Sequence, residues 1–330
     1  MKARITKIIQ QLFEDKEYKF EVYIRIKDSM ILKKMILFEG NPNSGSDDEN
    51  FKKCVQDSIE EAIKNKFIDE NIEYDLAENI ADNQKKFYII KQDDSYEPFS
   101  MIKNSVAPIN KFSMDERDNA AGIFLKFKRR NLSLWAYQHI YPTAIPNKRN
   151  TSFLSLQQGD SFIGMDKPMF PIAKKVDILV IGDEIITSNI TLMERSFGFQ
   201  GFIKRHANKT IENITELGLV TNVDKLTDYI ERSKPKYAKK MMRIKNSKVL
   251  KMSSEDLLKR VQTLPRWNGK FEIEDEHIVL NTYSHVESLI ELLDETYTRS
   301  DVTGEEYKTD VKKWVGPPIA LKRQVKQELT

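Results

Sequence analysis

Alternation of apolar and polar residues predicts a series of strands. In YKFEVYIRIK, residues 18–27, every second residue is apolar, which is typical of a strand with one buried face. SMILKKMILF, residues 29–38, follows as its expected hairpin partner. Residues 121–137, AGIFLKFKRRNLSLWAY, form two such runs around a basic turn, so we expect a hairpin with a charged tip.

Two further segments predict strands deeper in a sheet. In VDILVIGDEIITSN, residues 176–189, two β-branched runs flank Gly182-Asp183, a pair suited to a two-residue turn. Because both runs are almost wholly apolar, we expect their strands to be central. KKFYIIK, residues 85–91, predicts another strand.

Helical periodicity dominates after residue 189, following one earlier helix at 51–67. The later helices are expected at 190–197, 200–217, 222–232, 235–246 and 254–263. FEIEDEHIVL, residues 271–280, interrupts them as a strand. Ser284 and Glu287 have the spacing of a capping box, which predicts that a last helix begins there.

Together these elements predict an α+β protein. We expect a smaller α+β module at residues 1–105 and a larger domain at residues 106–330. The larger domain would hold a mixed or mainly antiparallel sheet covered by the helices of residues 190–263.

Composition excludes several classes of protein. The chain has 330 residues, one cysteine and four histidines, so an internal disulfide and a Cys/His zinc site are excluded. It has no run of eighteen apolar residues and no signal-peptide pattern at its start, which predicts a cytoplasmic protein. Phosphate-cradling glycine loops and the HExxH and GxSxG motifs do not occur, and we expect no cofactor.

The positive charge is concentrated in the middle of the chain. Residues 121–260 contain 25 Lys and Arg against 13 Asp and Glu, a net charge of +12, whereas the whole chain has a net charge of +3. Such asymmetry favours a polyanionic partner, either nucleic acid or an anionic membrane surface.

The stretch KPKYAKKMMRIKN, residues 234–246, contains no acid and predicts an amphipathic helix that begins at Pro235. At about 100° per residue, its cations separate from Tyr237, Ala238, Met241, Met242 and Ile244. We predict that one exposed row contacts successive phosphates: Lys236, Lys239, Lys240 and Arg243. The alternatives are an ordinary surface helix with solvated lysines, or a helix lying on a membrane.

Two smaller basic clusters support the same prediction. Lys204 and Arg205 begin the long helix after SFGFQGF, and Arg129 and Arg130 form the tip of the predicted hairpin. The sequence lacks zinc-finger spacings and an RNP-type aromatic strand. We therefore expect contacts with the nucleic-acid backbone and little base preference.

A metal-dependent nuclease is the enzymatic alternative. Glu306 and Lys308, with Asp301 or Asp294 upstream, mimic an acid plus Glu-x-Lys arrangement that holds Mg²⁺. The pattern is short and common in so charged a chain, so we assign no catalytic residue and no metal site. His139 is expected to be a packed histidine rather than a general base.

Residues 176–214, VDILVIGDEIITSNITLMERSFGFQGFIKRHANKTIENI, resemble the centre of the KwaB family, the soluble component of the Kiwa anti-phage defence system. The similarity lies in the order of features: an apolar strand, a tight turn, a second strand ending at Asn189, and a Phe-rich link into a long helix. It extends over about residues 120–300. Phe197, Phe199 and Phe202 in the link are expected to anchor the helix in a core.

The resemblance implies an antiviral protein that binds phage DNA, associates with a KwaA-like membrane protein and forms a homodimer or a higher homo-oligomer. Such a protein would reach the inner face of the membrane through its partner. The resemblance supplies no catalytic residues. Three functions stay open: DNA binding largely without sequence specificity, a nuclease effector, and a non-catalytic module that assembles a complex.

Overall fold

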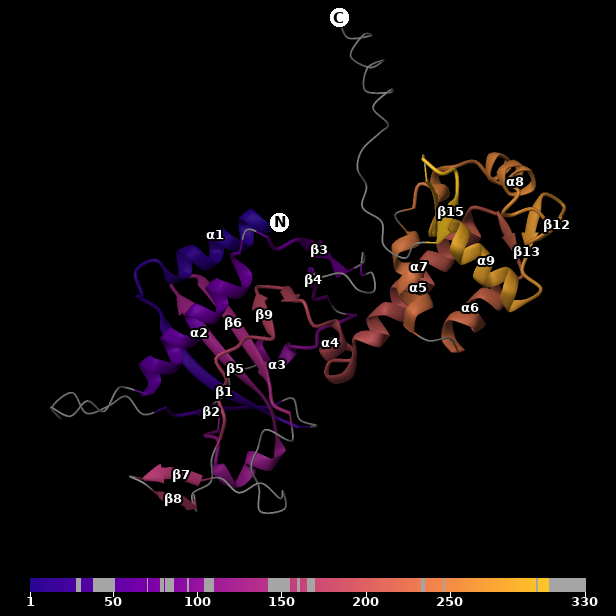
Figure 1. Cartoon of the computed structure of the whole chain (residues 1–330). Helices are drawn as coiled ribbons and strands as arrows, with labels where there is room; N and C mark the ends of the chain where they lie inside the picture. Colours follow the sequence, from indigo (N-terminus) through magenta and orange to yellow (C-terminus); the bar gives the residue numbers. More distant parts are fainter. Residues whose placement is uncertain are drawn as a thin grey trace, which may run out of the picture. The chain divides into compact units, whose positions relative to one another are not determined.

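The computed structural model describes residues 1–27, 31–37, 51–69, 71–77, 80, 86–93, 95–103, 110–141, 155–158, 161–164, 170–232, 235–245, 247–300 and 302–308. The chain divides into two compact units (Figure 1). The first contains Met1–Ala77 and Lys85–Phe202, and the second contains Glu78–Gln84 and Ile203–Thr330. The boundary predicted at residues 105/106 lies inside the first unit and separates no compact units.

An eight-stranded sheet organises the first unit, in the order β2-β1-β5-β6-β9-β10-β4-β3. Its neighbouring strands are antiparallel except β3 and β4, which are parallel, so the α+β class with a mixed sheet is confirmed. The strands are β1 (Lys19–Ile26), β2 (Leu32–Met35), β3 (Tyr74–Leu76), β4 (Phe87–Lys91), β5 (Ala120–Arg129), β6 (Leu132–His139), β9 (Ile178–Ile181) and β10 (Glu184–Thr187).

The predicted hairpins are confirmed. β9 and β10 pair through the two-residue turn at Gly182 and Asp183, where Gly182 has a φ of 58°, and both strands lie inside the sheet. The pairing of β1 with β2 and of β5 with β6 is also as expected. The sheet nevertheless interleaves strands from before and after residue 105, which is why no domain boundary falls there.

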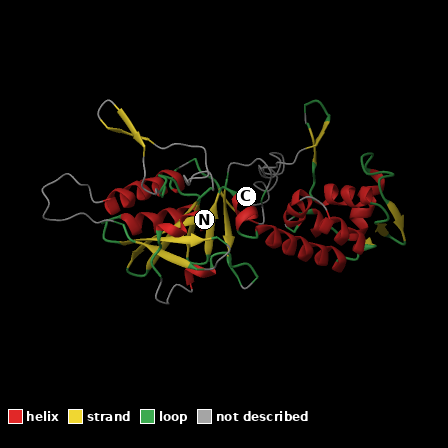
Figure 2. Ribbon diagram, turned by 90° about the horizontal axis from the view of Figure 1, so that it is seen from below, coloured by secondary structure: helices red, strands yellow, loops and turns green. Residues whose placement is uncertain are grey.

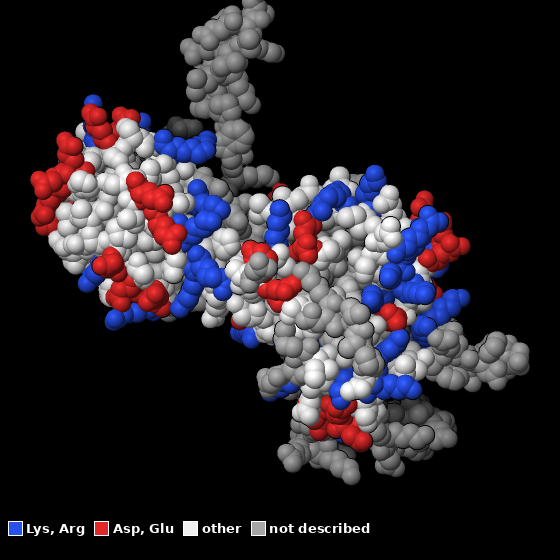
Figure 3. Space-filling view, turned by 180° about the vertical axis from the view of Figure 1, so that it is seen from behind, with Lys and Arg blue, Asp and Glu red and all other residues white. Residues whose placement is uncertain are grey.

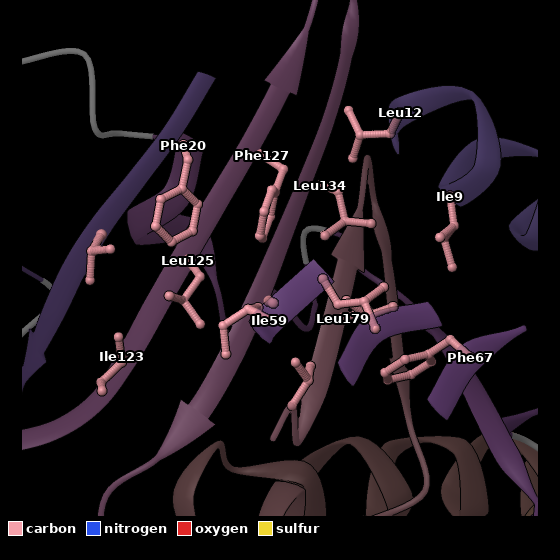
Figure 4. Packing of buried hydrophobic residues seen from close by; sticks show 14 of the residues in the cluster. Ile9, Leu12, Phe20, Ile59, Phe67, Ile123, Leu125, Phe127, Leu134 and Leu179 are labelled. Atoms are coloured by element: carbon pink, nitrogen blue, oxygen red, sulfur yellow. The ribbon is translucent and has the colours of Figure 1, made fainter. Parts of the chain in front are cut away.

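Two helices, α1 (Lys2–Phe13) and α2 (Phe51–Phe67), lie along one face of the sheet (Figure 2). Figure 4 shows Ile9 and Leu12 of α1 and Ile59 and Phe67 of α2 against a sheet surface that includes Phe127. Of the helices expected at residues 190–263, only the part up to Phe202 belongs to the same unit as this sheet, and the rest belong to the second unit. Helix α1 was not predicted, although its buried residues recur at helical spacing: Ile5, Ile9, Leu12 and Phe13.

Aromatic rings fill the opposite face of the sheet. Phe99 packs against Phe124 and Phe197, with ring centroids 5.5 and 4.6 Å apart, and the Tyr137 ring contacts all three. Gly122 is required on β5 because an added Cβ would lie 2.3 Å from Tyr137. Phe197, Phe199 and Phe202 are all less than 10% exposed, so their role as core anchors is confirmed.

Shorter elements complete the first unit. They are α3 (Ser100–Lys103), the 3-10 helix η2 (Met114–Asn119), the hairpin of β7 (Ser155–Gln158) and β8 (Ser161–Gly164), and α4 (Ile190–Ser196). The side chain of Asn189 caps α4 by accepting a hydrogen bond from the Leu192 amide.

The second unit is mainly helical. It holds most of α5 (Phe199–Glu216), together with α6 (Val223–Arg232), α7 (Pro235–Ile244), η4 (Val249–Lys251), α8 (Ser254–Thr263) and α9 (Tyr283–Leu293). Its strands are β11 (Val220–Thr221), β12 (Glu272–Glu274) and β13 (His277–Val279), which form one small sheet, and the hairpin of β14 (Tyr297–Arg299) and β15 (Glu306–Lys308).

Helix α9 packs against both α6 and α7. Its N-cap is Thr282, which accepts a hydrogen bond from the His285 amide, so the predicted capping box at Ser284 and Glu287 is wrong by two positions. Residues 271–280, predicted as one strand, form the β12–β13 hairpin, because the chain reverses at Asp275 and Glu276, both with positive φ.

Candidate nucleic-acid interface

Basic and acidic side chains are interspersed over the face of the molecule shown in Figure 3. Net charge alone therefore does not mark an interface. The predicted cations must be judged one at a time, by their exposure and by the acids near them.

Helix α7 does not present four cations in an exposed row. Its apolar face is buried as expected, with Met241 at 0% and Met242 at 2% exposure. Lys240 is itself only 4% exposed, so it belongs to the buried side of the helix. The exposed cation of the predicted row is Lys236, and Lys239 is partly exposed.

Arg243 is occupied by an acid. Its guanidinium donates to Asp294 at 2.8 Å, at the C-terminal end of α9, and the two side chains are 17% and 11% exposed. A pair this well covered holds α7 against α9. Arg243 therefore has a structural role, and the exposed row of four cations predicted from the sequence is interrupted at Lys240 and Arg243.

Lys204 and Arg205 lie exposed on α5. The Lys204 ammonium donates to the Glu231 carbonyl oxygen at 3.3 Å, in the last turn of α6, where a cation is favourable because carbonyl groups end the helix there. This contact gives Lys204 a role in joining α5 to α6.

The β5–β6 turn carries the third predicted cluster. Arg129 is 13% exposed and bonds to Asp15 and to the Gln11 carbonyl oxygen, with Glu14 at 3.9 Å. Its charge is therefore largely compensated. Arg130 occupies the turn itself, is exposed, and has a φ of 48°. Glycine or asparagine is favoured at such a position, so the arginine is held in a left-handed conformation that costs free energy.

Around this turn the surface forms a hollow of about 520 Å³, which we call the tip hollow. Its lining contains five cations: Lys16, Lys19, Lys128, Arg129 and Arg130. The other two lining residues are Glu17 and Tyr18. Because the charge of Arg129 is compensated, four cations of the lining remain against a single acid, Glu17. Lys16 also has a positive φ, of 54°.

The cations of the tip hollow are close to one another because of the strand register. Lys19 of β1 pairs directly with Lys128 of β5. Like charges at such positions destabilise an antiparallel pair. Among the described residues, no ion pair joins Lys19, Lys128 or Arg130 to an acid, and Lys16 has one loose contact, to Asp57 at 3.5 Å. This surface therefore has uncompensated positive charge.

Further cations continue along the same face of the sheet. Lys126 is two residues from Lys128 on β5, and its ammonium lies 4.7 Å from the centre of the Trp135 ring. Burial lowers the pKa of Lys126; repulsion by Lys128 and Lys34 lowers it further, whereas Glu21 opposes the change. Lys34 bonds to Glu21 at 2.6 Å.

The residues of the nuclease alternative have other partners. Arg266 bonds to Glu306 and lowers the pKa of this carboxyl group, while Lys308 bonds to Glu291. Asp294 holds Arg243, and Asp301 lies outside the described residues. Within the described part of the chain, no three His, Cys, Asp or Glu residues are grouped so as to hold a metal ion.

Sequence reasoning found Arg130 but not Lys16 and Lys19, which lie more than one hundred residues away. The alternation in residues 18–27 places Lys19 on the polar side of its strand, but only the pairing of β1 with β5 brings it to Lys128.

We also find that none of the described helices has the length and apolar character needed to cross a membrane.

Comparison with known protein families identifies the family to which the chain belongs. A family model described as Kiwa protein KwaB-like matches residues 117–303, more than half of the sequence. This range includes residues 176–214, so the resemblance found there is confirmed. It also includes Lys128 and Arg130, whereas Lys16 and Lys19 precede it. No curated protein and no solved structure matches the chain.

Proposed function

Since the chain belongs to the KwaB-like family of Kiwa proteins and so has a role in Kiwa anti-phage defence, we propose that it acts there by binding DNA through the tip hollow. The observation that carries the proposal is the uncompensated charge of Lys19, Lys128 and Arg130. A phosphate seated among them would relieve the repulsion between Lys19 and Lys128. It would also release counterions from the nucleic acid.

The mechanism is electrostatic. Contacts from lysine and arginine to phosphate oxygens fix a nucleic acid on the protein but carry no sequence information. Bound in this way, the protein would occlude phage DNA from the machinery that copies it. Cleavage is not part of the proposal. Plasmid DNA incubated with the protein and Mg²⁺ should stay intact, and Glu306→Ala should leave DNA binding unchanged.

The test is a salt titration of binding to random-sequence duplex DNA by fluorescence anisotropy. The wild type is compared with a variant in which Lys19, Lys128 and Arg130 are changed together to Gln. Each lost phosphate contact removes about 0.9 from the slope of log affinity against log salt, so the triple change should lower the slope by nearly three.

A matched control has three Gln substitutions at the predicted cations of the second unit, Lys204, Lys236 and Lys239. We expect its slope to equal that of the wild type. A loss confined to this control would place the interface on α5 and α7, at the cations that the sequence predicted there. If the wild type at low salt binds neither this duplex nor the single strand of the same sequence, DNA binding is removed altogether and the complex-assembly function is left.

Two further parts of the proposal rest on family membership. We propose that the protein acts with a KwaA-like membrane protein and that it forms a homodimer or a higher homo-oligomer. Co-purification of the two proteins from detergent-solubilised membranes tests the first part. Light scattering after size-exclusion chromatography tests the second, and a monomeric mass at micromolar concentration would contradict it.

A further inference from the structure

The tip hollow differs from a flat basic surface in three respects. It is concave, its cations come from two segments that face each other, and it contains an aromatic side chain. Lys16 and Lys19 flank it on the α1–β1 side, and Lys128 and Arg130 flank it on the β5–β6 side. These features say more about the partner than charge alone does.

The size of the hollow limits what can enter it. The hollow is open to solvent, and its volume of about 520 Å³ is similar to that of small-molecule pockets, roughly 300–1,000 Å³. One or two nucleotides of an extended strand fit such a space. A duplex, whose major groove alone is about 12 Å wide, is too broad to enter and would contact only the rim.

Tyr18 supplies the aromatic surface. Its hydroxyl donates to Glu60, and its ring lies 5.2 Å from the Phe13 ring and 5.4 Å from the Phe127 ring, centre to centre. These contacts fix the ring at the hollow. A positively charged groove combined with an aromatic side chain is the arrangement by which proteins bind single strands, since bases stack on the ring while cations hold the backbone.

We propose that the tip hollow binds an unpaired stretch or an end of a nucleic-acid strand in preference to an intact duplex. Lys19, Lys128 and Arg130 hold the phosphates, and a base stacks against Tyr18. The strand leaves the hollow along β5, past Lys126. This inference rests on the proposed DNA binding and adds the form of nucleic acid that is bound.

The experiment compares a mixed-sequence single-stranded 16-mer with the blunt duplex of the same sequence, at one salt concentration. The single strand should bind at least tenfold more tightly. Lys19→Gln, Lys128→Gln and Arg130→Gln together should abolish the difference. Tyr18→Leu should lower single-strand affinity by about 5- to 150-fold, because stacking on one aromatic ring is lost. Tyr18→Phe keeps the ring and should stay within twofold of the wild type.

A competition arm separates a strand from a free nucleotide, which offers the same phosphate chemistry. Mononucleotide 5′-monophosphate should not displace the 16-mer at an equal concentration of phosphate groups. Displacement by the mononucleotide would make the hollow a small-molecule site and overturn the inference.

Two other results would overturn it. Tighter binding of the duplex, with no effect of Tyr18→Leu, would leave DNA binding standing but reject the preference for unpaired strands. If neither DNA form binds, the proposed function falls as well. Should Tyr18→Leu fail to fold, a 16-mer containing 5-iododeoxyuridine is photo-crosslinked to the wild type instead. Adducts are expected at Tyr18, and adducts only elsewhere in the chain would reject the site.

Discussion

Lys19 and Lys128 lie directly opposite each other on neighbouring antiparallel strands of the sheet. Side chains at such positions have Cβ atoms about 5 Å apart, so the two ammonium groups repel each other. In the same hollow, Lys16 and Arg130 have the left-handed backbone conformation that glycine accommodates best. Both features cost stability and concentrate positive charge, which is consistent with a surface selected for an anionic partner.

Reversing one charge of this pair should stabilise the fold. In Lys128→Glu the new carboxylate faces Lys19, so we expect the free energy of unfolding to rise by about 0.5 kcal/mol at low salt. Urea denaturation measures it. DNA affinity should fall in the same variant. Lys128→Gln, which removes the repulsion without adding an attraction, should give a smaller rise, and a lower stability for Lys128→Glu would contradict the register argument.

Substitutions at Arg130 separate the effect of its charge on DNA affinity from the effect of its backbone conformation on stability. In Arg130→Gly the left-handed φ of 48° costs nothing, so we expect the free energy of unfolding to stay level or to rise by up to about 1 kcal/mol. Arg130→Val loses the same charge, but a β-branched residue at this φ is strained, so its stability should fall. DNA affinity should decrease equally in both. Unequal losses of affinity would mean that DNA binding depends on the geometry of the turn and not on the charge of Arg130.

Local patterns in the sequence predicted much of the secondary structure. The helix predicted at 51–67 and the hairpin at Gly182-Asp183 have the expected bounds, because a period of 3.6 residues or a turn signal is a property of neighbouring residues. The domain boundary could not be predicted in this way. It depends on strands from both sides of residue 105 entering one sheet, and single-sequence periodicity does not specify which strands pair.

The same limit applies to the interface. Helical spacing correctly separated Met241 and Met242 from Lys236, but it placed Lys240 and Arg243 on the exposed side. Burial of Lys240 and the pairing of Arg243 depend on the packing of α9 against α7, a helix some fifty residues further along. Conversely, the charge of the tip hollow comes from residues in two distant segments, and only the one at the β5–β6 turn is conspicuously basic in the sequence.

Loss of Arg243 should therefore destabilise the protein. Arg243→Ala leaves the Asp294 carboxylate covered and without its guanidinium, and breaking a buried pair in this way costs about 3–5 kcal/mol. Because both side chains keep some exposure, we expect a loss near the lower figure, about 3 kcal/mol, in urea denaturation. Lys239→Ala on the same helix should change stability by less than about 0.5 kcal/mol. Equal stability of the two variants would show that the pair contributes little.

This prediction bears on how binding is tested. A variant that neutralises the whole predicted row of α7, with Arg243 included, would lose affinity through unfolding even if α7 never contacts DNA. If Arg243→Ala is examined below its unfolding temperature, the slope of log affinity against log salt should equal that of the wild type. A slope lowered by about one would instead count Arg243 among the phosphate contacts.

His139 should make stability depend on pH near neutrality. It is half-buried on β6, its Nδ1 lies 3.2 Å from the Tyr137 hydroxyl, and its amide donates to Asp177 at 2.8 Å. Burial lowers the pKa of His139; Arg25 and Lys175 lower it further, and Asp177 opposes them. The folded protein then binds fewer protons at this site than the unfolded chain, whose histidine pKa is about 6.5.

The contribution of His139 is consequently complete above pH 6.5 and is lost as the pH falls below that value. Urea denaturation between pH 5.5 and 7.5 should show the free energy of unfolding decreasing toward acid, and His139→Gln should make this dependence shallower. The range stays above the titration of ordinary carboxyl groups, so their contribution is small. If His139→Gln keeps the full dependence of the free energy of unfolding on pH, another group takes up the proton. The dependence then does not come from the neutral, packed state of His139.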